Sequence, residues 1–374
     1  MVNFVICEFN PFHNGHAYLL ERVHDRPTVC IMSGHVTQRG AFAFTDKWTR
    51  AKMALQNGAD LVLELPAAAA AGSAMDFAAG AMRVAEATGF EGRLCFGTEG
   101  NVVRELAALA RLPEEQVREQ ITPYLKQGLS PAAALMEVYR GYLPDAAEIL
   151  KSPNNLLAFE YIKANRKFSV LTIDRKGSGH DSAEPTDKFA SASYLRAEPA
   201  RFTSYTPQNT HAAYTKLLET GRYLDGQKAS LVILAALRDI PRDKWEKRFP
   251  GGLGARLAAA VAQYTDLNTA IDAVKAKNFT HSSVRRAVLS AYLDIPKDST
   301  QHFVRVLGMN ETGKKLLGEM HPTLPVLIKP AKVTALPAAA QAQLTQDARI
   351  TDRFTYLWHT PQPKGLEYSS PIVL

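Results

Sequence analysis

The chain has 374 residues, of which 46% are hydrophobic and 22% are charged. This composition excludes disordered and fibrous proteins and is typical of a globular chain long enough for two domains, each with its own core. The net charge of +7 favours a polyanionic partner such as nucleic acid, although many basic proteins bind none.

No apolar run reaches the roughly 18 residues that a membrane span requires, so no membrane partner is expected. The N-terminus opens into an apolar strand pattern without the basic region of a signal peptide, and we expect a cytoplasmic protein. Cys7, Cys30 and Cys95 lack CxxC spacing and neighbouring ligands. They are therefore predicted to be buried reduced thiols, with neither a disulfide nor a zinc site.

Short apolar runs alternate with amphipathic segments from residue 2 to about residue 97. Strands are predicted at 2–7, 27–33, 60–65 and 93–97, and helices at 14–25, 46–58 and 73–88. Strands that alternate with helices imply βαβ units. The N-terminal half is therefore expected to be an α/β domain with a doubly wound parallel sheet, covered by helices on both faces.

Residues 101–150 have a helical pattern interrupted by prolines, which predicts a helical insertion. Ser152 can cap a helix that begins at Pro153, and 168–173 indicates a further strand. A loop is expected at 174–189.

After a short helix in "ASASYLR" (190–196), few strand patterns remain and 209–294 has a helical pattern throughout. We therefore expect a catalytic domain over 1–200 and a second, mainly helical and basic domain over 201–374.

Two histidines, His13 and His16, bracket an Asn-Gly step in "EFNPFHNGH", directly after the first predicted strand. The loop leaves the carboxyl end of a strand, which is the edge where open α/β sheets bind ligands. A helix that begins near Asn14 or Gly15 points backbone N–H groups into that crevice and favours phosphate.

Gly15 allows close approach to a ligand, and two imidazoles three residues apart can both donate to charge that grows on an α-phosphate and its leaving pyrophosphate. We therefore predict a nucleotide site; the alternative is that the histidines only cap the helix.

"EFNPFHNGH" resembles the HxGH signature of the HIGH nucleotidyltransferase superfamily, whose members share a Rossmann-like fold with class I aminoacyl-tRNA synthetases. Within it, the chain resembles the tRNA(Met) cytidine acetate ligases in "MSGHVTQRG", "KWTRAKMALQNGADLVLELP", "FGTE", "SPNNLLAFEY" and "ASASYLR". The resemblance implies that ATP and acetate form acetyl-adenylate and pyrophosphate. The N4 amine of the wobble cytidine in elongator tRNA(Met) then takes the acetyl group and AMP leaves. Acetyl-CoA is not the donor, and Mg²⁺ is expected as the companion of ATP.

The resemblance also implies which residues form the ATP site. His13 and His16 are the catalytic pair. The binding residues are Ile6, Cys7, Glu8, Phe9, Asn10, Pro11, Phe12, His13, Asn14, Gly15, His16, Ala17, Tyr18, Leu19, Gly97, Asn154, Arg175, Lys176, Ser193 and Arg196.

Gly97 avoids a collision with the nucleoside, Asn154 can bond a base or ribose edge, and Arg175 can balance phosphate charge. Ser193 and Arg196, together with Ser191, are candidates for holding the outgoing phosphates; the alternative is a capped helix with a surface arginine.

Other candidates rest on weaker patterns. Ser33, Gly34, His35, Gln38 and Arg39 follow the second strand and are candidates for holding acetate, ATP or the anticodon.

Lys47, Arg50 and Lys52 form either a basic rim for RNA or a solvated helix face. His180 and Asp181 are a weak candidate for a metal or acid–base pair. Phe279, Tyr292, Phe303 and Tyr356 are expected in the core. The string after Gly40 is Ala41-Phe42-Ala43, where the family usually has Glu-Pro-Ala.

Two other functions stay open at this point. A small-molecule adenylyltransferase would share the HxGH chemistry but would need no large basic helical domain. A nucleotide-responsive RNA-binding protein with a silent site would bind tRNA without releasing pyrophosphate. The sequence predicts no particular oligomeric state.

Overall fold

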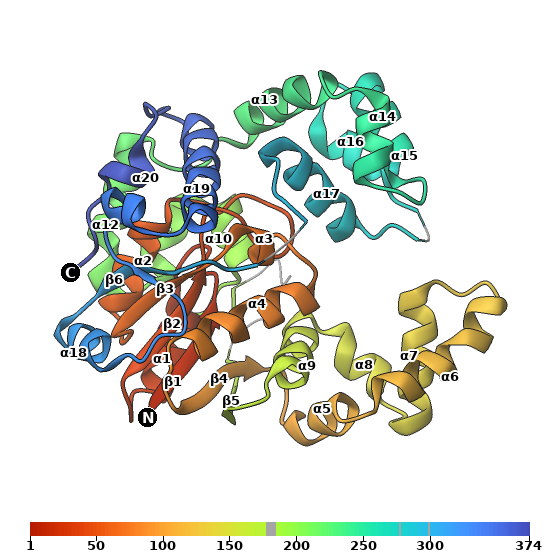
Figure 1. Ribbon diagram of the computed structural model, residues 1–374, viewed down its shortest axis with the longest axis horizontal. Coiled ribbons are helices and arrows are strands. Elements are labelled where there is room, and N and C mark those ends of the chain that lie inside the picture. The colour runs from red at the N-terminus through yellow and green to blue at the C-terminus, as the bar shows by residue number, and fades with distance from the viewer. Residues whose placement is uncertain (177–184, 277, 298–299) are drawn as a thin grey trace.

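A sheet forms the centre of the structure, which is a computed structural model that describes residues 1–176, 185–276, 278–297 and 300–374. Its described strands are β1 (Val2–Cys7), β2 (Thr28–Ser33), β3 (Leu61–Leu65), β4 (Gly92–Thr98), β5 (Ser169–Asp174), β6 (Val304–Met309) and β7 (Val326–Leu327). They lie in the order β5-β4-β1-β2-β3-β6-β7 (Figure 1). The five strands β5, β4, β1, β2 and β3 are parallel to one another, so the predicted doubly wound α/β fold is confirmed.

Three sets of helices lie against the sheet, and two further groups project from it. The covering helices of the first half are α1 (Asn14–Arg22), α2 (Lys47–Leu55), α3 (Ala67–Ala70), α4 (Ala74–Ala87) and α9 (Pro153–Ala164). Those that follow β5 are α10 (Ala192–Ala197), η1 (Pro199–Arg201), α11 (Phe202–Tyr205), η2 (Gln208–Thr210) and α12 (His211–Thr220). The C-terminal part adds α18 (Glu311–Glu319), η3 (Pro330–Ala335), α19 (Ala338–Tyr356) and α20 (Leu366–Ser369).

The two projecting groups lie on the same side of the molecule in Figure 1. One is the insertion, made of α5 (Val103–Ala110), α6 (Glu114–Lys126), α7 (Pro131–Tyr142) and α8 (Ala146–Lys151). The other, called the helical lobe here, is made of α13 (Gly226–Arg238), α14 (Arg242–Arg248), α15 (Leu253–Gln263), α16 (Leu267–Val274) and α17 (His281–Leu293). Both groups fall in segments where helices were expected.

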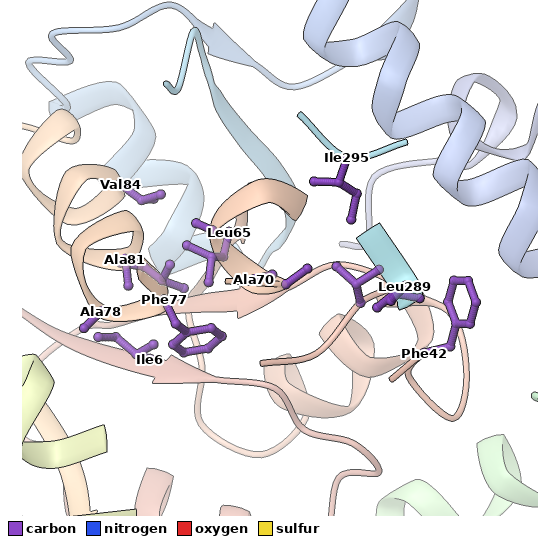
Figure 2. Packing of buried hydrophobic residues seen from close by; sticks show 14 of the residues in the cluster. Ile6, Phe42, Leu65, Ala70, Phe77, Ala78, Ala81, Val84, Leu289 and Ile295 are labelled. Atoms are coloured by element: carbon purple, nitrogen blue, oxygen red, sulfur yellow. The ribbon is translucent and has the colours of Figure 1, made fainter. Parts of the chain in front are cut away.

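The inner strands are apolar on both sides, which requires a cover on each face. Ile6 of β1 and Leu65 of β3 lie with Phe77 of α4 in one core (Figure 2). Val5 and Cys7 of β1 point to the opposite face, because successive side chains of a strand alternate. There they join a second core with residues of α1, α2 and α12.

Strand β6 was not predicted, because few strands were expected after residue 200. It pairs with β3 in the antiparallel direction and extends the sheet beyond the parallel strands. Tyr214 and Leu217 of α12 also pack against the sheet in the second core. The expected boundary at residue 200 therefore does not coincide with the limits of the sheet, and the helical lobe joins the same core through Leu289 of α17 (Figure 2).

Several local expectations hold in the structure. The Ser152 side chain caps α9 by accepting the Asn155 N–H, and Pro153 occupies the first position of that helix. Cys7, Cys30 and Cys95 are buried, as predicted. Within the described ranges, no helix is long and apolar enough to cross a membrane.

Candidate active site

A cavity opens at the carboxyl ends of β1, β4 and β5. The strand order runs from β1 to β2 and β3 in one direction and to β4 and β5 in the other, so the cavity lies at the point where the order reverses. This is where open α/β sheets bind ligands. Its lining residues are His13, Gly15, His16, Tyr18, Leu19, Gly97, Ile173, Asp174, Arg175, Lys176, Phe189, Ala190 and Ser191.

The two histidines cap α1 and line the cavity at the same time. His13 is the N-cap residue, and its Nδ1 accepts the Gly15 N–H at 3.0 Å. The Nδ1 of His16 accepts the His13 N–H at 3.3 Å, and the two rings stack with centroids 3.7 Å apart. Because Nδ1 is the acceptor in each neutral ring, the proton is on Nε2. Capping and phosphate binding are therefore compatible, since the cap uses Nδ1 of each ring and phosphate binding would use the Nε2–H.

Gly15 is needed for the position of His13. A Cβ on Gly15 would lie 2.9 Å from Cε1 of His13. The missing side chain therefore makes room for the imidazole of the capping residue. The position of the His13 ring is therefore a second reason for a glycine at position 15, in addition to the predicted close approach of a ligand.

The residues between β1 and His13 pack against the histidine rings or anchor the loop to neighbouring elements. Phe9 and Phe12 are buried, and their ring centroids lie 5.0 and 5.7 Å from that of His16. The Phe12 carbonyl accepts the Tyr214 hydroxyl at 2.5 Å, and Asn10 Oδ1 accepts the Phe44 N–H at 2.6 Å. Six of the fourteen residues in the predicted ATP segment are thus buried under the cavity and do not line it: Ile6, Cys7, Phe9, Asn10, Pro11 and Phe12.

The "ASASYLR" segment lies beside this loop. Ser191 lines the cavity and caps α10 by accepting the Tyr194 N–H at 3.1 Å, and its Oγ lies 3.0 Å from Oγ of Ser193. The Arg196 guanidinium donates to the Asn10 carbonyl at 2.6 Å. Ser193 and Arg196 are not among the lining residues, so their predicted contact with phosphate stays a prediction.

The opposite wall comes from β4, β5 and α1. A Cβ on Gly97 would lie 2.9 Å from Cγ of Arg175, so the arginine stem takes the space that the glycine leaves. Arg175 and Lys176 are exposed at the end of β5, and the Lys176 ammonium lies 5.0 Å from the ring centroid of Tyr18. These two cations give the cavity wall a positive potential, which suits phosphate.

Asn154 does not line the cavity. Its amide donates to Glu99 Oε1 at 2.5 Å, and the neighbouring Asn155 binds both the N–H and the carbonyl of Glu99. The "FGTE" and "SPNN" strings are therefore joined through Glu99. A contact of Asn154 with a base or ribose stays a prediction.

The loop after β2 is tied to the loop after β1 by two residues. Glu8 Oε1 accepts the Gln38 N–H at 2.8 Å. Burial raises the pKa of Glu8, while the Gln38 N–H and the Arg50 guanidinium act against that rise.

Arg50 itself is fully buried and donates to the carbonyls of Glu8 at 2.6 Å, Ser33 at 3.1 Å and Gly34. It therefore connects the carboxyl ends of two strands, which no sequence argument anticipated.

Both alternatives for the cations of α2, a basic rim for RNA and a solvated helix face, are wrong for two of the three residues. Arg50 is buried, and so is Lys47, whose ammonium lies 2.8 Å from carboxylate oxygens of both Glu64 and Glu367. Only Lys52 is exposed. Positions 47, 50, 51 and 54 share one face of a helix, and Ala51 and Ala54 mark that face as buried. The helical spacing of Lys47 and Arg50 relative to these alanines could therefore have predicted that both cations are buried.

His35 is also a core residue and not a ligand in the cavity. It is 3% exposed, stacks on Phe354 with centroids 4.7 Å apart, and lies 3.2 Å from the Thr351 hydroxyl through Nδ1. Burial, and then the charges of Lys47 and Arg50, hold the pKa of His35 well below its ordinary value. Ser33 and Gly34 are buried too, while Gln38 and Arg39 are half-buried.

The remaining candidate residues differ in where they lie. Tyr292 and Phe303 are buried as expected and Phe279 is half-buried, but Tyr356 is 57% exposed. His180 and Asp181 lie outside the described residues. Within the ranges described, no three His, Cys, Asp or Glu side chains gather in a way that could hold a metal ion.

The chain is similar to known proteins over nearly its whole length. The family described as HIGH Nucleotidyl Transferase matches residues 2–368. A tRNA(Met) cytidine acetate ligase of Thermoanaerobacter sp. (strain X514) is 31% identical, over 99% of this chain and 98% of the relative. The protein of the same name from Halothermothrix orenii is also 31% identical, over 96% of each chain.

Two solved structures of Thermotoga maritima TmcAL are similar to this chain at 27% sequence identity. The form bound with alpha-thio ATP has a TM-score of 0.90 and covers 100% of this chain and 98% of its own. The apo form has a TM-score of 0.92 and covers 100% and 99%. The likeness extends over both projecting groups of helices, since the whole chain is covered.

Proposed function

Because this chain belongs to the HIGH nucleotidyl transferase family, and within it to the tRNA(Met) cytidine acetate ligases, we propose that it acetylates N4 of the wobble cytidine of elongator tRNA(Met) with acetate and ATP. The observation that carries the proposal is the pair His13 and His16, whose Nδ1 atoms accept backbone N–H groups while both rings line the cavity at the end of β1. The similar T. maritima protein bound with alpha-thio ATP supports ATP as the nucleotide.

In the first step, a carboxylate oxygen of acetate attacks the α-phosphorus of ATP, and the bond from that phosphorus to the β-phosphate oxygen breaks. Acetyl-adenylate forms and pyrophosphate leaves. Negative charge grows on the transferred phosphoryl oxygens and on the leaving group. The Nε2–H donors of the two imidazoles, the positive end of the α1 dipole and the cations Arg175 and Lys176 are the groups that would stabilise this charge.

In the second step, the exocyclic amine attacks the acetyl carbon, the carbon–oxygen bond to AMP breaks, and the amine loses one proton. The mixed anhydride reacts with water, so the cavity must exclude solvent until the amine arrives. Phe189 and Ala190, which precede α10, line the cavity, and the Asn14 side chain donates to the Lys188 carbonyl at 2.9 Å. Mg²⁺ would enter with ATP, and a cytoplasmic location follows from the tRNA substrate.

The test is incubation with ATP, labelled acetate and unmodified elongator tRNA(Met), followed by mass analysis of the nucleosides, with acetyl-CoA as a parallel donor. Label in N4-acetylcytidine from acetate plus ATP, and none from acetyl-CoA, is the expected result. Activation of another acid or transfer to a small molecule would support an adenylyltransferase instead. RNA binding without pyrophosphate release would support a silent binding protein.

A further inference from the structure

A basic cavity lies in the helical lobe, away from the site described above. Its volume is about 580 Å³, and we call it the lobe pocket. It lies between α13 and α14 on one side and the end of α17 and α19 on the other, the elements at the top of Figure 1. Its lining residues are Ala236, Ile240, Lys244, Trp245, Lys247, Arg248, Ala291, Tyr292, Asp294 and Arg353.

Positive charge dominates the lobe pocket. Lys244, Lys247 and Arg248 are three and four residues apart on α14, so they share one face of that helix, and the buried Trp245 anchors it. Asp294 is the one acidic side chain in the lining, and the Arg248 guanidinium already pairs with it at 2.8 Å. Lys244 and Lys247 are exposed, and neither forms an ion pair within the described part of the chain.

The floor of the lobe pocket touches the loop that follows β2. Tyr292 lines the pocket with the Arg353 guanidinium 5.3 Å from its ring centroid. The same tyrosine ring meets Phe42 edge-on, with centroids 6.2 Å apart. Phe42 stands in the string that departs from the usual family pattern, and here it is buried.

The middle of α17 also meets the same loop. Gly40 has a φ of +74°, and a Cβ there would collide with the backbone nitrogen of Arg286. Only a glycine permits this approach of loop and helix. The loop after β2, which the buried Arg50 ties to the loop after β1, is thus in contact with the helix that carries the pocket floor.

We infer that the lobe pocket binds backbone phosphates of the RNA acceptor and sets the position of the RNA relative to the catalytic loops. This inference rests on the proposed function. Several cations around a concave surface, with their one carboxylate already neutralised, suit phosphate oxygens, and contacts of this kind position an RNA without reading its sequence.

The insertion offers a second basic cavity, of about 680 Å³, with Arg111, Lys163 and Arg166 in its lining. There Lys163 pairs with Glu114 at 3.3 Å. Nothing in the described structure joins that cavity to the catalytic loops as Tyr292 and Gly40 join the lobe pocket. It therefore serves as a matched control for positive charge alone.

The experiment compares the double variant Lys244→Ala/Lys247→Ala with the control Arg111→Ala/Arg166→Ala. Binding of unmodified tRNA is measured at several salt concentrations, and acetylation is measured against RNA concentration. The lobe variant is expected to bind roughly tenfold more weakly, with a salt slope lower by about one for each phosphate that the variant no longer neutralises. Its KM for RNA rises while kcat is recovered at high RNA. The control retains wild-type values, and equal melting temperatures show that both variants are folded.

Unchanged RNA affinity in the lobe variant, or a loss confined to the control, overturns the inference. A fall in kcat that added RNA does not recover also overturns it, because the residues would then act on the chemical step. Failure of the proposed function is seen separately. If the wild type binds RNA through the lobe pocket but forms no N4-acetylcytidine, the pocket stands and the proposed reaction fails.

Discussion

Arg50 donates a hydrogen bond of 2.6 Å from its guanidinium to the carbonyl oxygen of Glu8, across the gap between α2 and the loop after β1. The same guanidinium also reaches the carbonyls of Ser33 and Gly34 at the end of β2. One buried side chain therefore fixes the loop after β1, which carries the HxGH motif, relative to the loop after β2.

Replacing Arg50 by Met is expected to lower both stability and activity. It leaves four carbonyl oxygens, those of Glu8, Ser33, Gly34 and Thr45, without the Arg50 donor, at about 1 to 3 kcal/mol for each buried group. The free energy of unfolding, measured by urea denaturation, should fall by at least one such increment. ATP–pyrophosphate exchange should fall as well at a temperature where the variant is fully folded. An unchanged urea midpoint would show that Arg50 is not the tie between the loops.

Substitutions at His13 separate capping from catalysis. Asn is a good N-cap, so His13→Asn should retain stability within about 1 kcal/mol, whereas His13→Ala should lose about 0.5 to 2 kcal/mol with the cap. Both variants lack the Nε2 donor. We expect acetate-dependent pyrophosphate exchange to fall on the order of 10²-fold in each, as for the loss of a preorganised donor.

His16→Ala should show the same loss of exchange without unfolding the protein. Exchange at the wild-type rate in His13→Asn or His16→Ala would reduce the histidines to helix caps. Circular dichroism at the assay temperature checks that each variant is folded.

Two lysines of α2 provide a matched pair for stability. Lys47 is buried between the carboxylates of Glu367 and Glu64; burial alone would lower its pKa, but these charges outweigh burial and raise it. Lys47→Met should cost about 3 to 5 kcal/mol, because it removes the ammonium that lies between these two largely buried carboxylates. Lys52→Met, on the exposed face, should stay within about 0.5 kcal/mol of the wild type. Equal urea midpoints for the two variants would contradict the burial of Lys47.

His35 makes stability depend on pH. Its pKa in the folded protein is well below the ordinary value of 6.5, so below pH 6.5 the unfolded chain binds a proton that the folded chain does not. Stability should therefore fall as the pH falls from 6.5 toward the folded pKa, and it is fully retained above 6.5. Between pH 7.5 and 5.5, the wild type should lose about 1 kcal/mol more than His35→Gln. The free energy of unfolding is measured by urea denaturation at both pH values. Equal losses in the wild type and His35→Gln would show that His35 binds a proton as readily in the folded protein as in the unfolded chain.

The first half of the fold and the two site histidines were predictable because the sequence patterns that indicate them are local. The strand pattern of 2–7, the string "EFNPFHNGH" and the helix after it are continuous in the sequence, and they place His13 and His16 at a sheet edge without further information. The capping alternative also described a real feature, since His13 caps α1 through Nδ1.

The features that were missed depend on pairs far apart in the chain. Lys47 meets Glu367 across 320 positions, and β6 joins β3 from the C-terminal part. A charged residue whose partner lies that far away looks like a surface residue in its own segment. The contact of Tyr292 with Phe42 was invisible for the same reason, although the burial of the tyrosine was expected.

In the proposed reaction, acetate attacks the α-phosphorus of ATP at the site of His13 and His16. The most direct measurement supplies acetate labelled with ¹⁸O in both carboxylate oxygens, together with ATP and unmodified elongator tRNA(Met), and determines the mass of the AMP released. An acetyl-adenylate intermediate requires one ¹⁸O atom in each AMP that accompanies an N4-acetylcytidine. AMP without label, or acetylcytidine formed without AMP, would contradict activation of acetate at the α-phosphate.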